Sequence, residues 1–415
     1  MKRVVITGIG AITPIGNNIP EYLDGLKNGR SGANPLTKFN AEQFKTKFAC
    51  EIKDFDVESF MDRREARRLD DFTIYGMISA DEAITMSGLG EGDFDPDRVG
   101  VIWGSGIGGL PTLEAEIEGF TTGNGIPRYN PFLIPKMIID IVAGQISIKY
   151  GFRGVNYATV SACASSSHAI SNAFDYIRLG RNDIIITGGS EASITKVSVG
   201  GFGSMKALST RNDDFETASR PFDQDRDGFV LGEGSGALVL EELEHAKKRG
   251  ATIYGEVVGA GATADAYHIT APHPEGLGAR NVMRLALADA QMNIDEVDYI
   301  NVHGTSTPLG DKAEVAAIQH VFGDHAYKLN ISSTKSMTGH LLGAAGAIEV
   351  IAGLLGINHQ FVPPTINHFT DDPELDPKLN FTFNDAQERP IKAFLSNTFG
   401  FGGHNSSVII RKFEG

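Results

Sequence analysis

The first candidate for chemistry is a cysteine in a run of small residues, Cys163 within residues 159–167 (TVSACASSS). An extended, β-branched segment precedes this run and a segment with helical periodicity follows it, which predicts a strand-to-helix turn. At the start of a helix the backbone N–H groups are unpaired and the dipole is positive, which favours a thiolate over a thiol. Cys163 is therefore a candidate nucleophile, and this run alone leaves an inert core cysteine as the alternative.

Two histidines stand where strands end or helices begin. His303, in residues 301–311 (NVHGTSTPLGD), leaves a predicted strand, and α/β folds place ligand contacts at such strand ends. The alternative for His303 is a hydrogen-bonded loop histidine. His340, in residues 333–346 (STKSMTGHLLGAAG), precedes an apolar, Gly/Ala-rich helix that we expect to run to about Leu355.

The Gly/Ala-rich helix has a consequence for the ionisable residues around it. Glycine costs about 1 kcal/mol relative to alanine in a helix, so such a helix is stable only when it is deeply buried. Lys335, His340 and Glu349 are then ionisable groups on or beside a buried element. Groups of this kind are commonly paired or functional.

A glycine-rich stretch near the C-terminus, residues 396–405 (SNTFGFGGHN), follows a predicted strand. Its glycines would let backbone N–H groups approach a ligand closely, as an oxyanion hole requires. The aromatic residues beside the glycines would also suit a movable gate. A tight turn that ends the last hairpin is the alternative.

Two other motifs match known sites only in part. Residues 104–109 (GSGIGG) fit the dinucleotide fingerprint, but residues 124–129 lack the acidic residue expected about 20 positions further on. Residues 223–228 (DQDRDG) begin like a calcium loop, but position 12 of that loop falls on Gly234 instead of a glutamate. We therefore expect neither site, and interpret 223–228 as a folded, charged loop. No pair of histidines or cysteines has zinc spacing.

Short β-branched runs alternate with helical patterns along the chain, which predicts an α/β protein with largely buried sheets. Two series of strands indicate a weak internal repeat, because residues 4–11 parallel 257–262 and residues 99–104 parallel 299–304. The first half carries about 50 extra residues, around 110–149, which could form a cap over a site. We predict strands at 3–7, 98–103, 156–160, 183–187, 236–241, 252–258, 298–302, 329–332, 392–396 and 407–411, and helices at 20–27, 139–150, 279–290 and 312–322.

Composition narrows the class of protein. The chain has 415 residues and a net charge of −15, which argues against general nucleic-acid binding or an anionic membrane partner. With two cysteines a disulfide framework is not expected, and Cys50 is interpreted as structural. The interruptions at Thr7, Gly8 and Gly10 predict a first strand instead of a signal peptide. No window approaches the roughly 18 apolar residues of a membrane span, so we expect a cytoplasmic protein without membrane insertion.

Residues 159–167, 301–311, 333–346 and 397–405 together resemble the elongating β-ketoacyl-acyl-carrier-protein synthases of fatty-acid biosynthesis, most closely the long-chain type called synthase II. Residues 220–223 (RPFD) with 226–234 (RDGFVLGEG) are a further signature of this family, and the resemblance covers essentially the whole chain. It implies the thiolase fold, in which two similar halves form a five-layer αβαβα sandwich, normally as a homodimer. The halves would be residues 1–250, with the cysteine and the extra segment at about 110–150, and residues 251–415.

By this resemblance, Cys163, His303 and His340 form a Cys-His-His triad. The implied acyltransferase reaction is a decarboxylating Claisen condensation, in which malonyl-carrier protein elongates an acyl group on Cys163 by two carbons. Initiating ketosynthases have asparagine where this chain has His340, so an elongating enzyme is the closer match. The backbone N–H groups of Cys163 and Phe401 would form the oxyanion hole. His404 stands where the family most often has threonine. This difference would affect only the movement of the glycine-rich loop as a gate, and not the backbone N–H of Phe401.

The resemblance also implies supporting residues. Lys335 is expected to act in the catalytic centre by holding His340 and nearby charges, with support from Glu349 and Asp311. The expected substrate contacts are Thr270, Thr305, Thr307, Phe399 and Phe401. A structural monovalent cation, Na⁺ or K⁺, is expected near Asn301, Glu349, Ser396 and Asn397. No other cofactor is expected, because the phosphopantetheine group arrives on the carrier protein.

The expected partner is an acyl-carrier protein in its acyl and malonyl forms, and it is acidic. Its basic landing patch is expected among Arg63, Arg64, Arg67, Arg68, Arg128 and Lys206. For residues 63–68 a solvated helix is the equal alternative, because acidic residues are interleaved with the arginines.

Other functions remain open at this point. A thiolase acting on coenzyme A would carry a second catalytic cysteine near the C-terminus, and no cysteine follows Cys163. A synthase of type I or a polyketide ketosynthase is closer, although 415 residues without linkers suit a free-standing enzyme. A non-catalytic subunit that only sets chain length would typically lack the nucleophile. The sequence does not fix the preferred acyl length.

Overall fold

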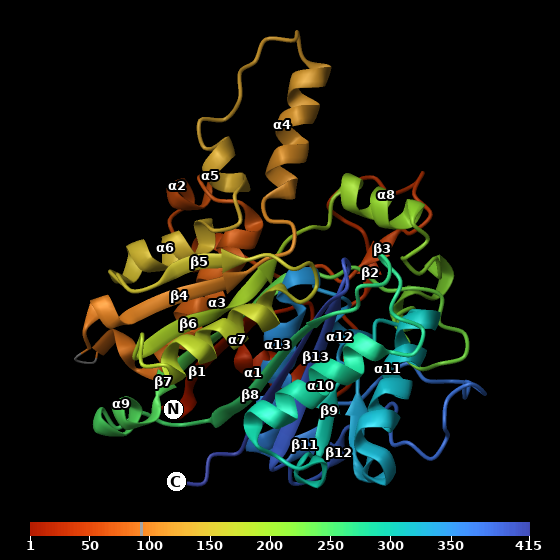
Figure 1. Cartoon of the computed structure of the whole chain (residues 1–415). Helices are drawn as coiled ribbons and strands as arrows, with labels where there is room; N and C mark the ends of the chain where they lie inside the picture. Colours follow the sequence, from red (N-terminus) through yellow and green to blue (C-terminus); the bar gives the residue numbers. More distant parts are fainter. Residues whose placement is uncertain (92–93) are drawn as a thin grey trace.

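The computed structural model describes residues 1–91 and 94–415, and its centre is a ten-stranded sheet (Figure 1). The first five strands are β1 (Val4–Ile12), β4 (Val99–Gly104), β5 (Asn156–Thr159), β6 (Ile184–Glu191) and β7 (Gly234–Glu242). The other five are β8 (Gly255–Ala264), β9 (Tyr299–Asn301), β10 (Asn330–Ser332), β13 (Ala393–Gly400) and β14 (His404–Arg411). All predicted strands are confirmed, with ends that differ by several residues.

The two sets of five strands have the same topology. The sheet order is β10-β9-β13-β14-β8-β1-β7-β6-β4-β5. From its outer edge inward, each half therefore runs through the third, second, fourth, fifth and first strand of its own set. The two first strands meet in the middle, where residues 4–6 pair with residues 255–257 in antiparallel register. This shared order confirms the duplication that the weak sequence repeat predicts.

Helices form three layers around the two half-sheets. Helices α7 (Ser165–Arg178) and α13 (Ala345–His359) contact strands of both halves and form the middle layer (Figure 1). Helices α3 (Asp71–Ser87) and α6 (Ile141–Tyr150) pack against the first half, and α10 (Leu277–Ala290) and α11 (Pro308–Phe322) cover the second. Shorter helices of the body are α1 (Ile19–Lys27), α2 (Arg63–Ala66), α8 (Lys196–Ser204), α9 (Leu243–Lys248) and α12 (Lys335–Thr338). Two short ladders pair β2 (Asn34–Pro35) with β3 (Phe48–Ala49) and β11 (Phe361–Val362) with β12 (Gln387–Glu388). The result is the αβαβα sandwich; the domain boundary at residue 250, between α9 and β8, stays a prediction.

Helix α13 corrects one expectation from the sequence. Residues 342–359 have a mean hydropathy of 1.4 and are long and apolar enough to cross a membrane, so such a window does exist. In the folded chain 89% of this segment is buried. Because α13 lies between the two half-sheets, neighbouring backbone and side chains surround it on all sides, which explains its apolar and glycine-rich composition.

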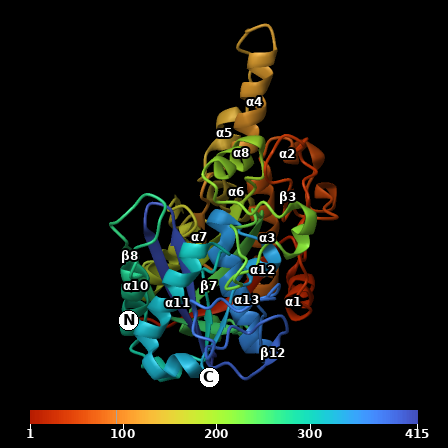
Figure 2. The same ribbon diagram turned by 90° about the vertical axis from the view of Figure 1, so that its right-hand side faces the viewer.

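The extra segment of the first half is an arm. Helices α4 (Leu110–Thr122) and α5 (Leu133–Met137) project from the body of the molecule in both views (Figure 1, Figure 2). All of residues 110–150 are described, and none of them lines the cavity at Cys163. Within one chain the arm therefore does not form the expected cap over that cavity.

The two partial motifs have structural explanations. The N–H groups of Gly106 and Ile107 in the glycine-rich loop donate to the buried carboxylate of Glu191, at 2.8 and 3.2 Å. A side chain of the protein thus takes the place that a dinucleotide phosphate would need. In the loop at 223–228, Asp223 accepts from backbone N–H groups of residues 225, 369 and 370, as a structural carboxylate does. Cys50 is 1% exposed and burial raises its pKa to about 12, in agreement with a structural cysteine.

Candidate active site

Cys163 lies in the turn between β5 and α7, as the sequence predicts. Ala162 adopts a φ of +51°, in the left-handed region, so the turn is sharp. Ser165 holds this turn: its Oγ donates to the carbonyl oxygen of Ala162 at 2.7 Å and accepts from the N–H of Ser161 at 2.9 Å. The Cys163 side chain is 8% exposed and lies at the floor of a cavity.

The fold brings both predicted histidines to the cysteine. Nε2 of His340 lies 3.0 Å from Sγ of Cys163. The rings of His303 and His340 are nearly perpendicular, with centroids 5.3 Å apart. Sγ of Cys163 and one ring nitrogen from each histidine all lie within 4.8 Å of one another. This spacing is also short enough for three ligands of a soft metal ion, although the sequence has no zinc-like spacing.

Burial sets the charge of the three groups. It raises the pKa of Cys163 to about 12, against the charge of Lys335 and the N–H groups of Phe401 and Cys163 itself. Burial, with the charge of Lys335, also lowers the pKa of His303 and His340 well below the usual range. At neutral pH the resting site therefore holds a thiol and two neutral imidazoles. Desolvation therefore opposes the thiolate that the helix start is expected to favour, while the N–H groups and Lys335 favour that thiolate.

Lys335 and Glu349 form an ion pair behind the histidines. Lys335 Nζ donates to Glu349 Oε1, and both side chains are at most 2% exposed. Burial raises the pKa of Glu349 to about 7, and Lys335 opposes this shift. The pair therefore keeps a positive charge in a buried position, where it disfavours protonation of either imidazole.

The glycine-rich loop lies over the cysteine. A Cβ built on Gly400 would lie 2.7 Å from the Ser161 carbonyl oxygen and 3.1 Å from the Cys163 nitrogen, so only glycine allows this approach. The loop is tied at its outer side, where the N–H of Gly402 donates to the carbonyl oxygen of Ile269 at 2.8 Å. The N–H groups of Phe401 and Cys163 both stabilise negative charge at Sγ.

All predicted substrate contacts line one cavity of about 510 Å³. They are Thr270, Thr305, Thr307, Phe399 and Phe401, together with the three triad residues. The cavity is open to solvent and largely apolar, as a site for an acyl chain and its carrier arm requires. Asp311 does not line it; this residue is fully buried at the start of α11 and accepts from the N–H groups of Phe222 and Ser306.

Two residues at the site were not predicted. Glu314 on α11 accepts from the N–H groups of His303 and Gly304, at 3.0 and 2.9 Å, and burial raises its pKa to about 7. An acidic residue among the apolar neighbours of a helix face was the signal in the sequence. Phe229 packs edge-on against His340 with centroids 5.4 Å apart, and no pattern in the sequence indicated this contact.

Three of the four residues predicted near a cation share one region of the interior. Asn301 and Ser396 are register partners on β9 and β13. Asn301 donates to the hydroxyl of Tyr299, and Glu349 is close enough to this tyrosine to raise the pKa of Tyr299. Among the described residues, Oδ1 of Asn301, Oγ of Ser396 and Oε2 of Glu349 are buried without a hydrogen-bond partner. The Asn397 side chain instead donates to Glu314 and accepts from Ser407, so it does not join this group.

The basic residues predicted to bind the carrier protein are all exposed but do not form one cluster. Lys206 lines the mouth of the Cys163 cavity. Arg64 and Arg68 line a separate groove with Phe132 of the arm, and the Arg68 guanidinium lies over that ring. Of the remaining three, Arg63 begins α2, Arg67 directly follows α2, and Arg128 lies in the connection between α4 and α5.

A buried cysteine beside two neutral histidines, in a duplicated αβαβα sandwich, defines a thiolase-fold condensing enzyme. Two family models match this chain, the β-ketoacyl synthase N-terminal domain over residues 1–246 and the β-ketoacyl synthase C-terminal domain over residues 254–369. The chain belongs to the β-ketoacyl synthase family.

Characterised relatives cover the whole chain. It is 48% identical over 413 residues to 3-oxoacyl-[acyl-carrier-protein] synthase 2 of Synechocystis, with 100% of this chain and 99% of the relative covered. The protein of the same name from Coxiella burnetii is 47% identical, with 99% of both chains covered. Among solved structures, a β-ketoacyl synthase from Burkholderia phymatum matches with a TM-score of 0.91 at 34% identity and full coverage of both chains. A type II polyketide ketosynthase in complex with its acyl-carrier protein matches with a TM-score of 0.89 at 33% identity, again with full coverage.

Proposed function

We propose that this protein is an elongating 3-oxoacyl-[acyl-carrier-protein] synthase of type 2, in which Cys163 carries the growing acyl chain and His303 and His340 activate malonyl-carrier protein. The observation that carries the assignment of roles is the 3.0 Å contact between Cys163 and His340, with His303 beside them in the same cavity. The relatives at 47–48% identity over their full length support the reaction.

The first half-reaction is acyl transfer. Sγ of Cys163 attacks the thioester carbonyl of the acyl-carrier protein, and the C–S bond to the pantetheine breaks. The Sγ proton passes to the departing pantetheine sulfur, so charge is balanced. The N–H groups of Cys163 and Phe401 stabilise the tetrahedral oxyanion, and with Lys335 they also lower the cost of the transient thiolate.

The second half-reaction starts with decarboxylation. The carboxylate of malonyl-carrier protein leaves as CO₂, and its electron pair forms an enolate on the thioester. Neutral imidazoles with hydrogen on Nε2 donate to the enolate oxygen, and Lys335 favours this state because its charge lowers the pKa of both rings.

Condensation completes the cycle. The enolate carbon attacks the acyl-Cys163 carbonyl, the bond to Sγ breaks, and the thiolate takes up one proton. The product is a β-ketoacyl chain, longer by two carbons, on the carrier protein. Glu314 holds the backbone of the loop that carries His303, so we assign it a positioning role.

The acyl-enzyme is the direct test of these roles. After incubation with acyl-carrier protein, intact-mass and peptide mass spectrometry should find one acyl group per chain, attached to Cys163. Malonyl-carrier protein should then remove it. A folded protein that never acquires the adduct, or acquires it at another residue, would contradict the mechanism.

A polyketide ketosynthase is the second candidate within the same reaction class. It has support from the polyketide ketosynthase with a TM-score of 0.89, but the identity of 33% is well below the 48% shared with synthases 2. A non-catalytic chain-length subunit is less consistent with a buried cysteine in contact with a histidine. Products formed from acyl-carrier proteins of graded length would separate these functions.

An acyl-carrier protein is the partner, and exposed basic residues near the entrance are its proposed contacts. Lys206 at the mouth of the cavity is the best placed; Arg64, Arg67, Arg68 and Arg128 lie apart from it and are proposed as separate contacts. Charge reversal at Lys206 should raise the KM for carrier-bound substrates most at low salt; an unchanged KM would remove it from the patch.

A homodimer is proposed from the edge of the sheet. Strand β5 forms the outer edge of the sheet on the side of the first half, and this edge pairs with no other strand of the sheet. Val160, which directly follows β5, is 59% exposed. The arm beside it exposes further large apolar side chains: Ile117, Phe120, Ile126, Tyr129, Phe132 and Ile134. A second copy of the chain would cover these residues. In such a dimer the arm would also contribute to the acyl cavity. Sedimentation should give twice the mass of the 44.5 kDa chain; a monomer at micromolar concentration would contradict this.

A monovalent cation is proposed near Asn301, Ser396 and Glu349, because their partnerless oxygens are the hard donors that Na⁺ or K⁺ prefers. Its role would be structural, so melting temperature should depend on the cation supplied at constant ionic strength. No catalytic step needs another cofactor. A cytoplasmic location remains a prediction from the sequence.

A further inference from the structure

The entrance of the Cys163 cavity is built largely from segments outside the sheet. In residues 305–309, which include the start of α11 at Pro308, the two threonines proposed to hold the carrier arm line this entrance with Pro308 and Leu309. Residues 220–228 lie beside them, and residues 367–372 lie behind those, and none of the three segments contains a strand longer than a single bridge. Their relative placement therefore depends on side-chain bonds, unlike that of the sheet.

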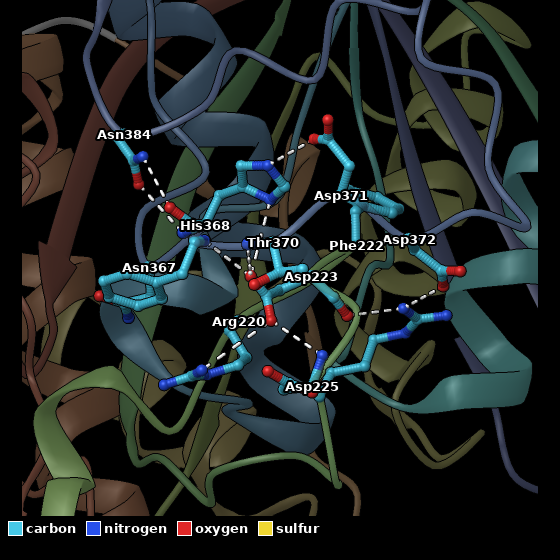
Figure 3. A network of polar contacts seen from close by, with 12 residues as sticks. Arg220, Phe222, Asp223, Asp225, Asn367, His368, Thr370, Asp371, Asp372 and Asn384 are labelled. Carbon is cyan, nitrogen blue, oxygen red and sulfur yellow. Dashed lines mark hydrogen bonds and ion pairs between the residues drawn. The ribbon is translucent and has the colours of Figure 1, made fainter.

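Asp223 joins the second and third of these segments (Figure 3). Its carboxylate is fully buried and accepts from the N–H groups of Phe369 and Thr370, at 2.7 and 2.9 Å, and from that of Asp225 at 2.9 Å. Burial alone would raise the pKa of Asp223, but these N–H groups and Arg220 hold it below the usual value. The Asp223 carboxylate is therefore ionised, and it forms the centre of the contact between residues 220–228 and residues 367–372.

His368 is held on three sides next to this carboxylate (Figure 3). Its ring stacks on Phe383 at a centroid distance of 3.6 Å, and its Nε2 lies 2.9 Å from the exposed carboxylate of Asp371. Its backbone N–H donates to Asn384 at 3.0 Å. The Nδ1 atom is buried without a hydrogen-bond partner among the described residues, and it lies 3.8 Å from Oδ2 of Asp223.

The same loop also holds the entrance. Arg226 donates to Asp372 at 2.6 Å on one side and to the carbonyl oxygen of Pro308 at 3.2 Å on the other. The N–H of Arg220 donates to Oγ of Ser306 at 3.0 Å, and that of Gly228 donates to the carbonyl oxygen of Ser306 at 3.1 Å. A shift of residues 220–228 would thus move the residues that receive the carrier arm.

We propose that Asp223 and His368 are positioning residues that fix residues 305–309 for the pantetheine arm of carrier-bound substrates, an inference that rests on the function proposed above. They act as a brace: His368 links Asp371 to Asp223, Asp223 fixes residues 220–228, and these fix the entrance. A preformed entrance binds the flexible arm with less loss of entropy than a mobile one.

The His368 ring lies between two carboxylates. Asp371 faces Nε2 and Asp223 faces Nδ1, with Arg220 on the far side of Asp223 at 3.8 Å, while Phe383 covers one face of the ring. The ring therefore occupies the space between residues 371 and 223, and its removal would leave residues 367–372 without this support.

The test uses His368→Leu, which keeps an apolar side chain on Phe383 and removes both nitrogens, with His320→Leu on an exposed helix position as the matched control. His368→Leu should raise the KM for malonyl-carrier protein about five- to tenfold, the effect of one or two hydrogen bonds, with kcat within twofold. Alkylation of Cys163 by iodoacetamide, which needs no carrier arm, should be unchanged.

Hydrogen exchange tests the brace without any substrate. His368→Leu should speed exchange in both 367–372 and 305–309, and Asp371→Asn, at an exposed position, should act in the same direction more weakly. Unchanged exchange at 305–309, or an unchanged KM for malonyl-carrier protein in His368→Leu, would overturn the proposal. A wild-type protein that fails to condense carrier-bound substrates, while exchange responds as expected, would overturn the proposed function and leave the brace standing.

Discussion

Cys163→Ala is expected to abolish condensation, with a loss of activity of about 10⁴-fold or more, because no other group can form the acyl-enzyme. Its sulfur lies 3.0 Å from Nε2 of His340, and the Phe401 N–H stabilises negative charge on it. The measurement is formation of β-ketoacyl-carrier protein from acyl- and malonyl-carrier protein. Decarboxylation of malonyl-carrier protein alone should persist, because His303 and His340 are untouched.

The fold should survive this substitution. Cys163 loses one sulfur atom at the floor of an open cavity, so the free energy of unfolding should change by no more than about 1 kcal/mol. Cys50→Ala is the matched control, because Cys50 is the other buried cysteine and should keep condensation activity. Elongation retained by Cys163→Ala, with correct mass and circular dichroism, would refute the role of the sulfur.

Replacement of either histidine should impair decarboxylation more than acyl transfer. Loss of one donor to an oxyanion costs about 10²- to 10³-fold in rate, so His303→Ala and His340→Ala should slow CO₂ release by that factor. Acyl transfer to Cys163 relies on the N–H groups of Cys163 and Phe401 instead, and should fall by about tenfold or less. Release of ¹⁴CO₂ from labelled malonyl-carrier protein and the burst of acyl-enzyme measure the two steps separately.

The protonation states of His303 and His340 predict how the rate of decarboxylation depends on pH. Burial lowers the pKa of both imidazoles well below the usual range, so both rings remain neutral donors between pH 6 and 8. Decarboxylation should therefore not increase as the pH falls through this window. His340→Asn keeps one N–H donor and should retain more decarboxylation than His340→Ala, whereas His320→Ala should change neither step. A histidine variant in which only acyl transfer suffers would show that the two roles are divided wrongly.

Much of the fold could be predicted from the sequence because it depends on local patterns. The ten strands, the repeat and the turn at Cys163 follow from β-branched runs, helical spacing and small residues, all of which act over short distances along the chain. The burial of α13 followed from the cost of glycine in an exposed helix. The family resemblance added the triad, whose members the fold brings together.

Other features depend on contacts between distant segments, so only the tertiary structure could decide them. Cys163 and His340 are 177 positions apart, and their 3.0 Å contact results from the packing of α7 and α13 between the half-sheets. The raised pKa of Cys163 reflects burial of the sulfur among segments that are distant in the sequence, which no local pattern encodes. The direction of the Asn397 side chain is set by strand register, and the arm projects from the body, which contacts it through Arg68 at Phe132 and through Val197 at Glu114.

The sequence by itself determined which chemical groups this protein has, in what order, and on what kinds of elements. It specified a cysteine at a strand-to-helix turn, two histidines near strand ends and a glycine-rich loop. The tertiary structure decided their distances, their protonation states and the residues that hold them, including Glu314 and Asp223. The physical reason is that periodicity and turn chemistry are local properties of the chain, whereas desolvation and hydrogen-bond geometry arise only when remote segments pack together.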